Sequence, residues 1–230
     1  MTAMKPQILS ASAFLACASL VHAQDAKPLS LSQVPLRADA PVLFAPRGWK
    51  IEKTVNADLN SDKVADAALV LVQNTPAKDA QGDPTPRQRA LLMLLREGKG
   101  WHRVGFNGEI LLGTRDGGAF FGVVETPVTI SIEKGVVIVE QESGSREVTS
   151  TTHRFQYNRF RKGVFFIGFD SVERDRGSGD VTSQSLNFLR GLKKTTTYDY
   201  ATKKSKTTNS RISGRLRTLE SLREADRYEQ

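Results

Sequence analysis

Apolar and polar residues largely alternate along the chain after residue 48. The first clear case is 49–55, Trp-Lys-Ile-Glu-Lys-Thr-Val. A period of two residues is typical of a β-strand that buries one face. Similar short segments, separated by turn residues, predict further strands at 101–106, 128–132, 136–139, 149–157, 163–169, 183–189, 195–200 and 205–212.

Two segments are apolar throughout instead of alternating. Residues 67–72, Ala-Ala-Leu-Val-Leu-Val, predict a central strand. Residues 90–95, Ala-Leu-Leu-Met-Leu-Leu, are ambiguous because Leu and Met favour helices. The Gly-Lys-Gly turn at 98–100 and the alternation that follows it favour a hairpin.

About ten short strands with tight turns and hardly any helical period predict an all-β antiparallel fold. A curved sheet, a sandwich or a partly open barrel would each fit this pattern. Leu216, Leu219 and Leu222 recur every three residues and predict a short C-terminal helix. We expect residues 49–230 to form a single domain, preceded by a Pro-rich leader at 24–48 that drapes over it. Residues 75–89 and the Gly-rich 113–122 are expected to be loops.

The first 23 residues indicate export. Lys5 precedes an apolar stretch at 8–21, and Val-His-Ala at 21–23 offers small residues to a signal peptidase. The stretch is too short and too rich in Ser and Ala for a membrane span, which needs about 20 apolar residues. Acylation at Cys17 as a lipoprotein is a less favoured alternative. Cys17 is the single cysteine, so cleavage at 23 leaves no disulfide. We therefore expect a periplasmic or secreted protein.

Residues 58–66 form a candidate cation loop. Ca²⁺ takes six to eight hard oxygen ligands, which alternate residues of a tight loop supply. The loop is no EF-hand, because Leu69 stands where the closing Glu belongs. Any Ca²⁺ binding is expected to be weak, with a dissociation constant of about 10⁻⁴–10⁻³ M. Alternatively, the side chains only cap the turn by accepting backbone N–H groups. The candidate ligands are the side chains of Asp58, Asn60, Asp62 and Asp66 and the carbonyl of Val64.

The loop resembles the Asp-x-Asn-x-Asp-Gly-x-x-Asp loop of FG-GAP/VCBS-type β proteins. Lys63 stands where that family has Gly, which costs on the order of 1 kcal/mol at positive φ and opposes a cation. The order of features over about 49–219 is similar to that of exported and lipoprotein-like bacterial β proteins that carry one such loop. The features are the loop, Gly-Thr-Arg-Asp-Gly-Gly-Ala-Phe at 113–120, His-Arg-Phe-Gln-Tyr at 153–157, Phe-Phe-Ile-Gly-Phe-Asp at 165–170 and Ser-Leu-Asn-Phe-Leu-Arg-Gly at 185–191. The resemblance implies a β fold and export, and it carries no statement about activity.

The net charge of +8 is concentrated near the C-terminus. Between 190 and 217 there are nine Lys or Arg residues and one acidic residue, Asp199. Such a stretch predicts an anionic partner, namely lipopolysaccharide, nucleic acid or an acidic protein. Alternatively it is a solvated sheet edge, since lysines on exposed strands prevent edge-to-edge aggregation. The residues are Arg190, Lys193, Lys194, Lys203, Lys204, Lys206, Arg211, Arg215 and Arg217.

The sequence contains no recognisable catalytic constellation. His102 and His153 are each expected to be packed or surface residues, and Asp116 and Glu125 flank the Gly-rich loop as the carboxylates to inspect first. The leading hypothesis is therefore a non-enzymatic periplasmic or surface binding or structural module. A polyanion-binding envelope protein comes second, and a hydrolase third.

Overall fold

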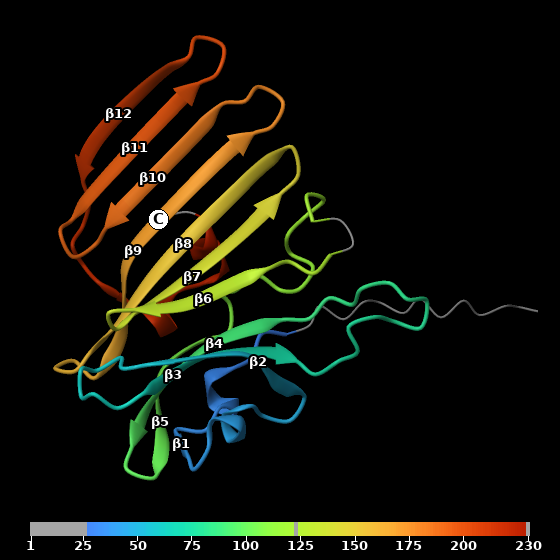
Figure 1. Ribbon diagram of the computed structural model, residues 1–230, viewed down its shortest axis with the longest axis vertical. Helices are drawn as coiled ribbons and strands as arrows, with labels where there is room; N and C mark the ends of the chain where they lie inside the picture. Colours follow the sequence, from blue (N-terminus) through green and yellow to red (C-terminus); the bar gives the residue numbers. More distant parts are fainter. Residues whose placement is uncertain (1–26, 122–123, 229–230) are drawn as a thin grey trace, which may run out of the picture.

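The computed structural model describes residues 27–121 and 124–228. This part of the chain is all-β and consists of two antiparallel sheets (Figure 1). The small sheet has the order β1-β5-β4-β3-β2, and the large sheet has the order β12-β11-β10-β9-β8-β7-β6, with β13 paired to β9. The predicted fold class is confirmed, and the described residues form no closed barrel. The predicted export signal at residues 1–23, with Cys17, lies outside the described residues.

The predicted strands are present, with two short ones that the sequence pattern did not indicate, β1 and β13. The small sheet contains β1 (Arg37–Ala38), β2 (Trp49–Ala57), β3 (Asp66–Gln73), β4 (Arg89–Glu97) and β5 (Gly100–Asn107). The large sheet contains β6 (Val128–Glu133), β7 (Val136–Gly144), β8 (Glu147–Asn158), β9 (Gly163–Asp175), β10 (Val181–Asn187), β11 (Leu192–Asp199), β12 (Lys204–Arg211) and β13 (Arg217–Thr218). Four 3-10 helices complete the described part of the fold: η1 (Leu31–Gln33), η2 (Pro41–Phe44), η3 (Leu219–Ser221) and η4 (Glu224–Arg227).

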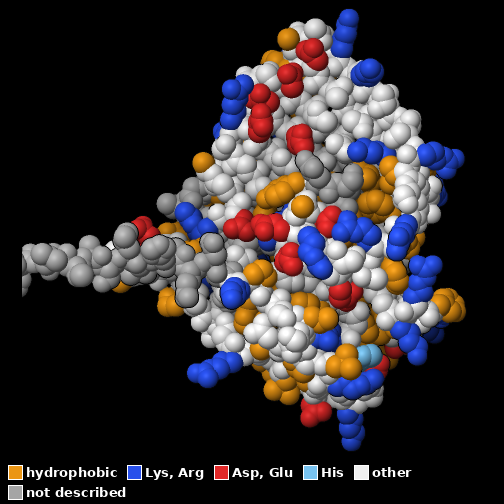
Figure 2. All heavy atoms as spheres, turned by 180° about the vertical axis from the view of Figure 1, so that it is seen from behind, with side chains coloured by type: hydrophobic (Ala, Val, Ile, Leu, Met, Phe, Trp, Pro, Cys, Tyr) orange, Lys and Arg blue, Asp and Glu red, His pale blue; other side chains and the backbone are white. Residues whose placement is uncertain are grey.

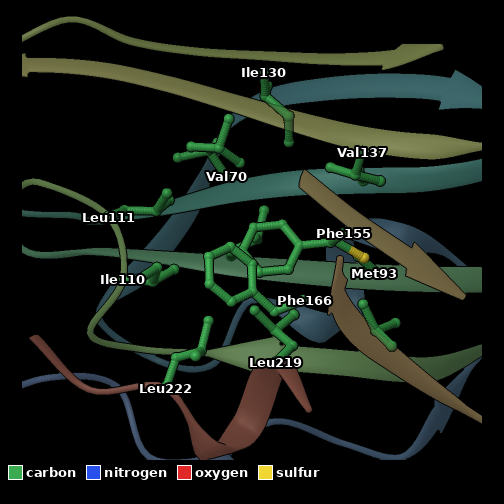
Figure 3. Close-up of a cluster of buried hydrophobic side chains, with 14 of the residues drawn as sticks. Val70, Met93, Ile110, Leu111, Ile130, Val137, Phe155, Phe166, Leu219 and Leu222 are labelled. Atoms are coloured by element: carbon green, nitrogen blue, oxygen red, sulfur yellow. The ribbon is translucent and has the colours of Figure 1, made fainter. Parts of the chain in front are cut away.

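One hydrophobic core lies between the two sheets (Figure 3). The small sheet contributes Val70 and Met93, and the large sheet contributes Phe155 and Phe166. Leu219 closes the core from the C-terminal segment. The two sheets therefore bury facing surfaces, as in a sandwich.

A second apolar cluster covers the other face of the small sheet. Leu29, Val34 and Phe44, all from residues 27–48, pack there against Leu69 and Leu92. Because β3 and β4 are covered on both faces, neither strand has a solvent side, and this explains why their sequences do not alternate.

The expected short C-terminal helix is present as two 3-10 helices, η3 and η4. Arg217 and Thr218 pair with β9 and keep the backbone extended, so the helical part begins at Leu219 and not at Leu216. The three-residue spacing matches the three residues per turn of a 3-10 helix, and it identified two buried residues, Leu219 and Leu222.

Strands β10, β11 and β12 extend the large sheet beyond the core (Figure 1). All eight residues of β12 are exposed, and Leu186 is the one buried residue of β10. Ladder pairing holds this part together, with Thr-rich strands that suit a sheet and a Thr196–Thr207 side-chain hydrogen bond of 3.0 Å. We call β10–β12 the extension; beyond Leu186 its faces are not buried by the core.

Candidate functional site

The basic residues singled out in the sequence lie on or next to the extension. Lys193 and Lys194 are on β11, Lys204 and Lys206 are on β12, and Arg211 ends β12. Arg190 and Lys203 occupy the connecting turns, and Arg215 follows β12. Seen from behind in Figure 2, Lys and Arg side chains are spread along the side of the molecule where the extension lies. The structure therefore places the basic residues between 190 and 215 in one part of the fold, the extension and its flanking turns.

The strand register divides these cations between the two faces of the extension. Leu186 is opposite Lys193, so Lys193 lies on the face that continues from the core. Thr197 and Asp199 follow Lys193 by four and six residues along β11, so they lie on the same face as Lys193. Lys206 and Lys204 are opposite these two residues on β12 and therefore share that face. Lys194 and Arg211 are on the opposite face by the same rule. We call the first surface the core-side face; it carries three lysines and one acidic residue, Asp199, which lies opposite Lys204.

The cations of the extension differ from the arginines of the neighbouring strands in their partners. On β8 and β9, Arg154 bonds Asp170 at 2.6 Å and Arg174 bonds Glu142 at 2.7 Å. Among the described residues, Lys193, Lys204 and Lys206 have no ion pair. No direct ion pair therefore compensates the three lysines in the described part of the chain, although Asp199 lies opposite Lys204 on the same face.

Two of the nine predicted residues are engaged locally. Arg217 forms a bidentate ion pair with Asp226, with N–O distances of 2.6 and 2.7 Å, and also donates to the carbonyl of Ser221. Lys203 lies 3.0 Å from the ring centroid of Tyr200 in a cation–π contact. The positive charge of Arg217 is therefore compensated inside the fold.

The 58–66 loop is closed by hydrogen bonds from its own backbone. Asp58 accepts N–H groups of four residues, the shortest being Ser61 at 2.6 Å and Lys63 at 2.8 Å. Desolvation alone would raise the pKa of Asp58, but these donors outweigh it, and its pKa lies below the ordinary value. Lys63 has φ of 68°, which is the left-handed conformation expected at the sixth loop position. The capping arrangement of the loop is present.

Asp66 holds the loop to the sheet. Its two carboxylate oxygens accept the backbone N–H groups of Leu59 at 2.8 Å and Arg96 at 2.9 Å, and the residue is fully buried. Desolvation raises the pKa of Asp66 above its usual range. Within the described chain, no three His, Cys, Asp or Glu residues are grouped as metal ligands. The Ca²⁺ site at Asp58, Asn60, Asp62, Val64 and Asp66 stays a prediction.

Calorimetry with Ca²⁺ on the wild type and on Asp62→Ala tests this prediction. Heat in the wild type with a dissociation constant of about 10⁻⁴–10⁻³ M, absent in the variant, would support the site. If neither protein gives heat on titration with Ca²⁺, the loop is not a Ca²⁺ site, and its carboxylates only cap the turn.

The two candidate catalytic carboxylates, Glu125 and Asp116, form contacts within the fold. Glu125 forms an ion pair with Arg87, whereas Asp116 accepts the N–H of Gly113 at 2.8 Å and lies 3.3 Å from Arg227. The two carboxylates thus have different arginine partners. Residues 122–123 of the Gly-rich loop lie outside the described residues.

His153 is a packed residue, as expected, and His102 lies at the surface beside Glu97. The ring of His153 is surrounded by Phe155, Phe166 and Phe169, and its Nε2 lies 3.0 Å from the carbonyl oxygen of Asp226. Desolvation lowers the pKa of His153 to about 4. The neutral imidazole therefore donates to Asp226 and links the core to η4.

Sequence reasoning missed an apolar groove beside the extension. Its walls include Leu186, Phe188 and Ile212, with Ala225 of η4 on the other side. These residues come from segments up to about forty positions apart, and no local pattern joins them. Their only sequence signal is that apolar residues continue where β10 and β12 end.

Comparisons with protein-family models, curated proteins and solved structures give no match for this chain. The resemblance to FG-GAP/VCBS-type loops and to exported bacterial β proteins therefore stays a prediction. In the described residues, no helix has the length and apolar character needed to cross a membrane.

Proposed function

We propose that the protein is a non-enzymatic binding module, periplasmic or secreted, that binds polyanions on the core-side face of its extension. The observation that carries the proposal is the absence of ion pairs for Lys193, Lys204 and Lys206 in the described structure. Unpaired cations attract an external anion without first having to break an internal ion pair.

The geometry of the strands supports a ligand with repeated charges. Lys204 and Lys206 are two residues apart on one face, which places them about 7 Å apart along β12. Lys193 lies on the neighbouring strand and faces the same side. A ligand with several anionic groups along its length would contact all three, whereas a single small anion would contact one.

The proposed location of the protein, the periplasm or the exterior of the cell, is inferred from the sequence. Export is indicated by residues 1–23, and an exported cationic surface would meet the anionic components of the envelope. The competing explanation, lysines that guard a free sheet edge, applies to β12, which is the outermost strand of the large sheet. Lysines that only prevent aggregation at the sheet edge need no affinity for a polyanion. A measurement of polyanion binding therefore distinguishes the two explanations.

Inorganic polyphosphate is a suitable probe because it carries charge without an apolar part. We expect the triple variant Lys193→Gln, Lys204→Gln, Lys206→Gln to bind polyphosphate more weakly than the wild type. The slope of log K against log salt concentration should become shallower by about two to three, close to one unit for each contact removed. Fluorescence anisotropy with labelled polyphosphate at several salt concentrations measures both quantities.

The matched control replaces three exposed lysines outside the extension, Lys27, Lys50 and Lys99, by glutamine. This variant has the same net charge as the first triple variant, and we expect it to keep the wild-type slope. If both triple variants lose the same affinity, binding follows net charge alone and the extension is not the site.

A further inference from the structure

The apolar groove beside the extension has a volume of about 610 Å³. This lies within the range of about 300–1,000 Å³ that is typical of small-molecule sites. Leu186 is buried at its base, and Phe188 and Ile212 are half-buried. Phe188 packs against Phe166 of the core, with ring centroids 4.9 Å apart. One wall is thus fixed by the core, and Ala225, which is exposed, forms part of the other.

The charged residues around the groove leave an excess of positive charge. Arg217 and Asp226 both line it, but they neutralise one another in their bidentate pair. Arg215 also lines it and has no ion pair within the described residues. Lys193 is opposite Leu186 and therefore stands next to the groove on the same face. In Figure 2, apolar side chains on this side of the molecule are bordered by Lys and Arg.

We propose that this groove binds the alkyl chain of an anionic amphiphile, whose phosphate head group pairs with Arg215 and Lys193. The apolar walls match a hydrocarbon chain, and the uncompensated cations at the rim match the head group. The core-side face continues from the groove through Lys206 and Lys204, where further anionic groups of a larger ligand would lie. The inference deepens the proposed function and rests on it, because it adds an apolar part to the anionic ligand.

The two parts of the ligand have separable effects on affinity. Each methylene that enters the groove should tighten binding by up to about three- to fourfold, as expected for transfer of hydrocarbon out of water. Loss of one exposed charge contact should weaken binding by up to about fivefold, independently of chain length. A substitution in the groove therefore changes the dependence on chain length, and a substitution at the rim changes only the overall affinity.

Calorimetry tests the proposal on the protein that starts at residue 24, after the predicted cleavage. The ligands are octyl, decyl and dodecyl phosphate, each below its critical micelle concentration. Ala225→Trp places a bulky ring in the groove from an exposed position and leaves the core side chains in place. Arg215→Gln removes one of the two charges at the rim and leaves Lys193. Phe160→Ser is the matched control, because Phe160 is a highly exposed aromatic residue that does not line the groove.

In the wild type we expect affinity to rise with each longer chain, and inorganic phosphate to bind far more weakly than dodecyl phosphate. Ala225→Trp should remove the rise, Arg215→Gln should keep it at lower affinity, and Phe160→Ser should behave as the wild type. A wild type indifferent to chain length, or Ala225→Trp with an undiminished rise, would overturn the proposal.

Polyphosphate binding distinguishes this failure from that of the proposed function. If the wild type binds polyphosphate on the extension but shows no dependence on alkyl chain length, the polyanion site stands and the groove proposal fails. If polyphosphate does not bind at all, the proposed function itself fails. A dimer in sedimentation that Ala225→Trp dissociates would assign the groove to a second copy of the chain and also overturn the proposal.

Discussion

Replacement of Arg89 by Met should destabilise the protein by about 3–5 kcal/mol, the usual cost of removing one partner of a buried ion pair. Arg89 is 3% exposed and makes two bonds to Glu52, at 2.7 and 2.8 Å. It also donates to the carbonyls of Leu112 at 3.2 Å and Thr126 at 2.8 Å. These carbonyls flank the 113–125 segment, so a single side chain holds both ends of that loop to the small sheet.

Denaturant unfolding of three variants checks this expectation. Arg89→Met leaves the Glu52 carboxylate and two carbonyls without their donor, and Glu52→Gln added to Arg89→Met should recover part of the loss. Arg154→Met is the matched control, since the Arg154–Asp170 pair is about one-third exposed on each side and should cost at most about 1 kcal/mol. If Arg89→Met is no more destabilised than Arg154→Met, the loop is not held by this residue.

Acidification from pH 6.5 to pH 4 should remove about 3 kcal/mol of stability through His153 alone. The pKa of His153 is lowered from 6.5 to about 4 because the ring is desolvated among phenylalanines. Above pH 6.5 the imidazole is neutral in both states and contributes no pH dependence. Below that value the unfolded chain takes up a proton that the folded chain does not, so unfolding is favoured until the pH reaches the folded pKa.

His153→Leu isolates this contribution. The variant loses the hydrogen bond to Asp226, about 1 kcal/mol at pH 7, but its stability should fall less steeply between pH 6.5 and 4 than that of the wild type. His102→Leu, at the surface histidine, should keep the steep fall. Urea unfolding at half-unit pH intervals gives the slope of the unfolding free energy against pH for each of the three proteins. Equal slopes for the wild type and His153→Leu would show that His153 does not cause the loss of stability at acidic pH.

The strands could be predicted from sequence because period-two alternation is a local property. Trp49 to Val55 shows it within seven residues, and β2 covers that segment. The unbroken apolar run of β3 likewise indicated a central strand, although not what covers its second face. The segment 24–48 was expected to drape over the domain, but Phe44 and Leu29 could not be identified as its covering residues, because the Pro-rich segment has no period.

The basic residues of the candidate site could be predicted from the sequence, but their arrangement in space could not. The lysines of β11 and β12 were found from charge alone, and strand alternation then fixes which of them share a face. The pairing of Arg217 with Asp226 and the groove formed by Phe188, Ile212 and Ala225 depend on contacts between distant segments. The spacing of Leu216, Leu219 and Leu222 predicted the short C-terminal helix, but not that the pairing of β13 with β9 delays its start to Leu219.

The salt dependence of polyphosphate binding by the wild-type protein tests the central claim most directly. A polyanion held by several unpaired cations releases counterions on binding, so log K should fall linearly and steeply as log salt concentration rises. We predict a slope of about two or more in magnitude, in line with contacts to Lys193, Lys204 and Lys206. Binding that does not change with salt, or no binding at low salt, would contradict the account.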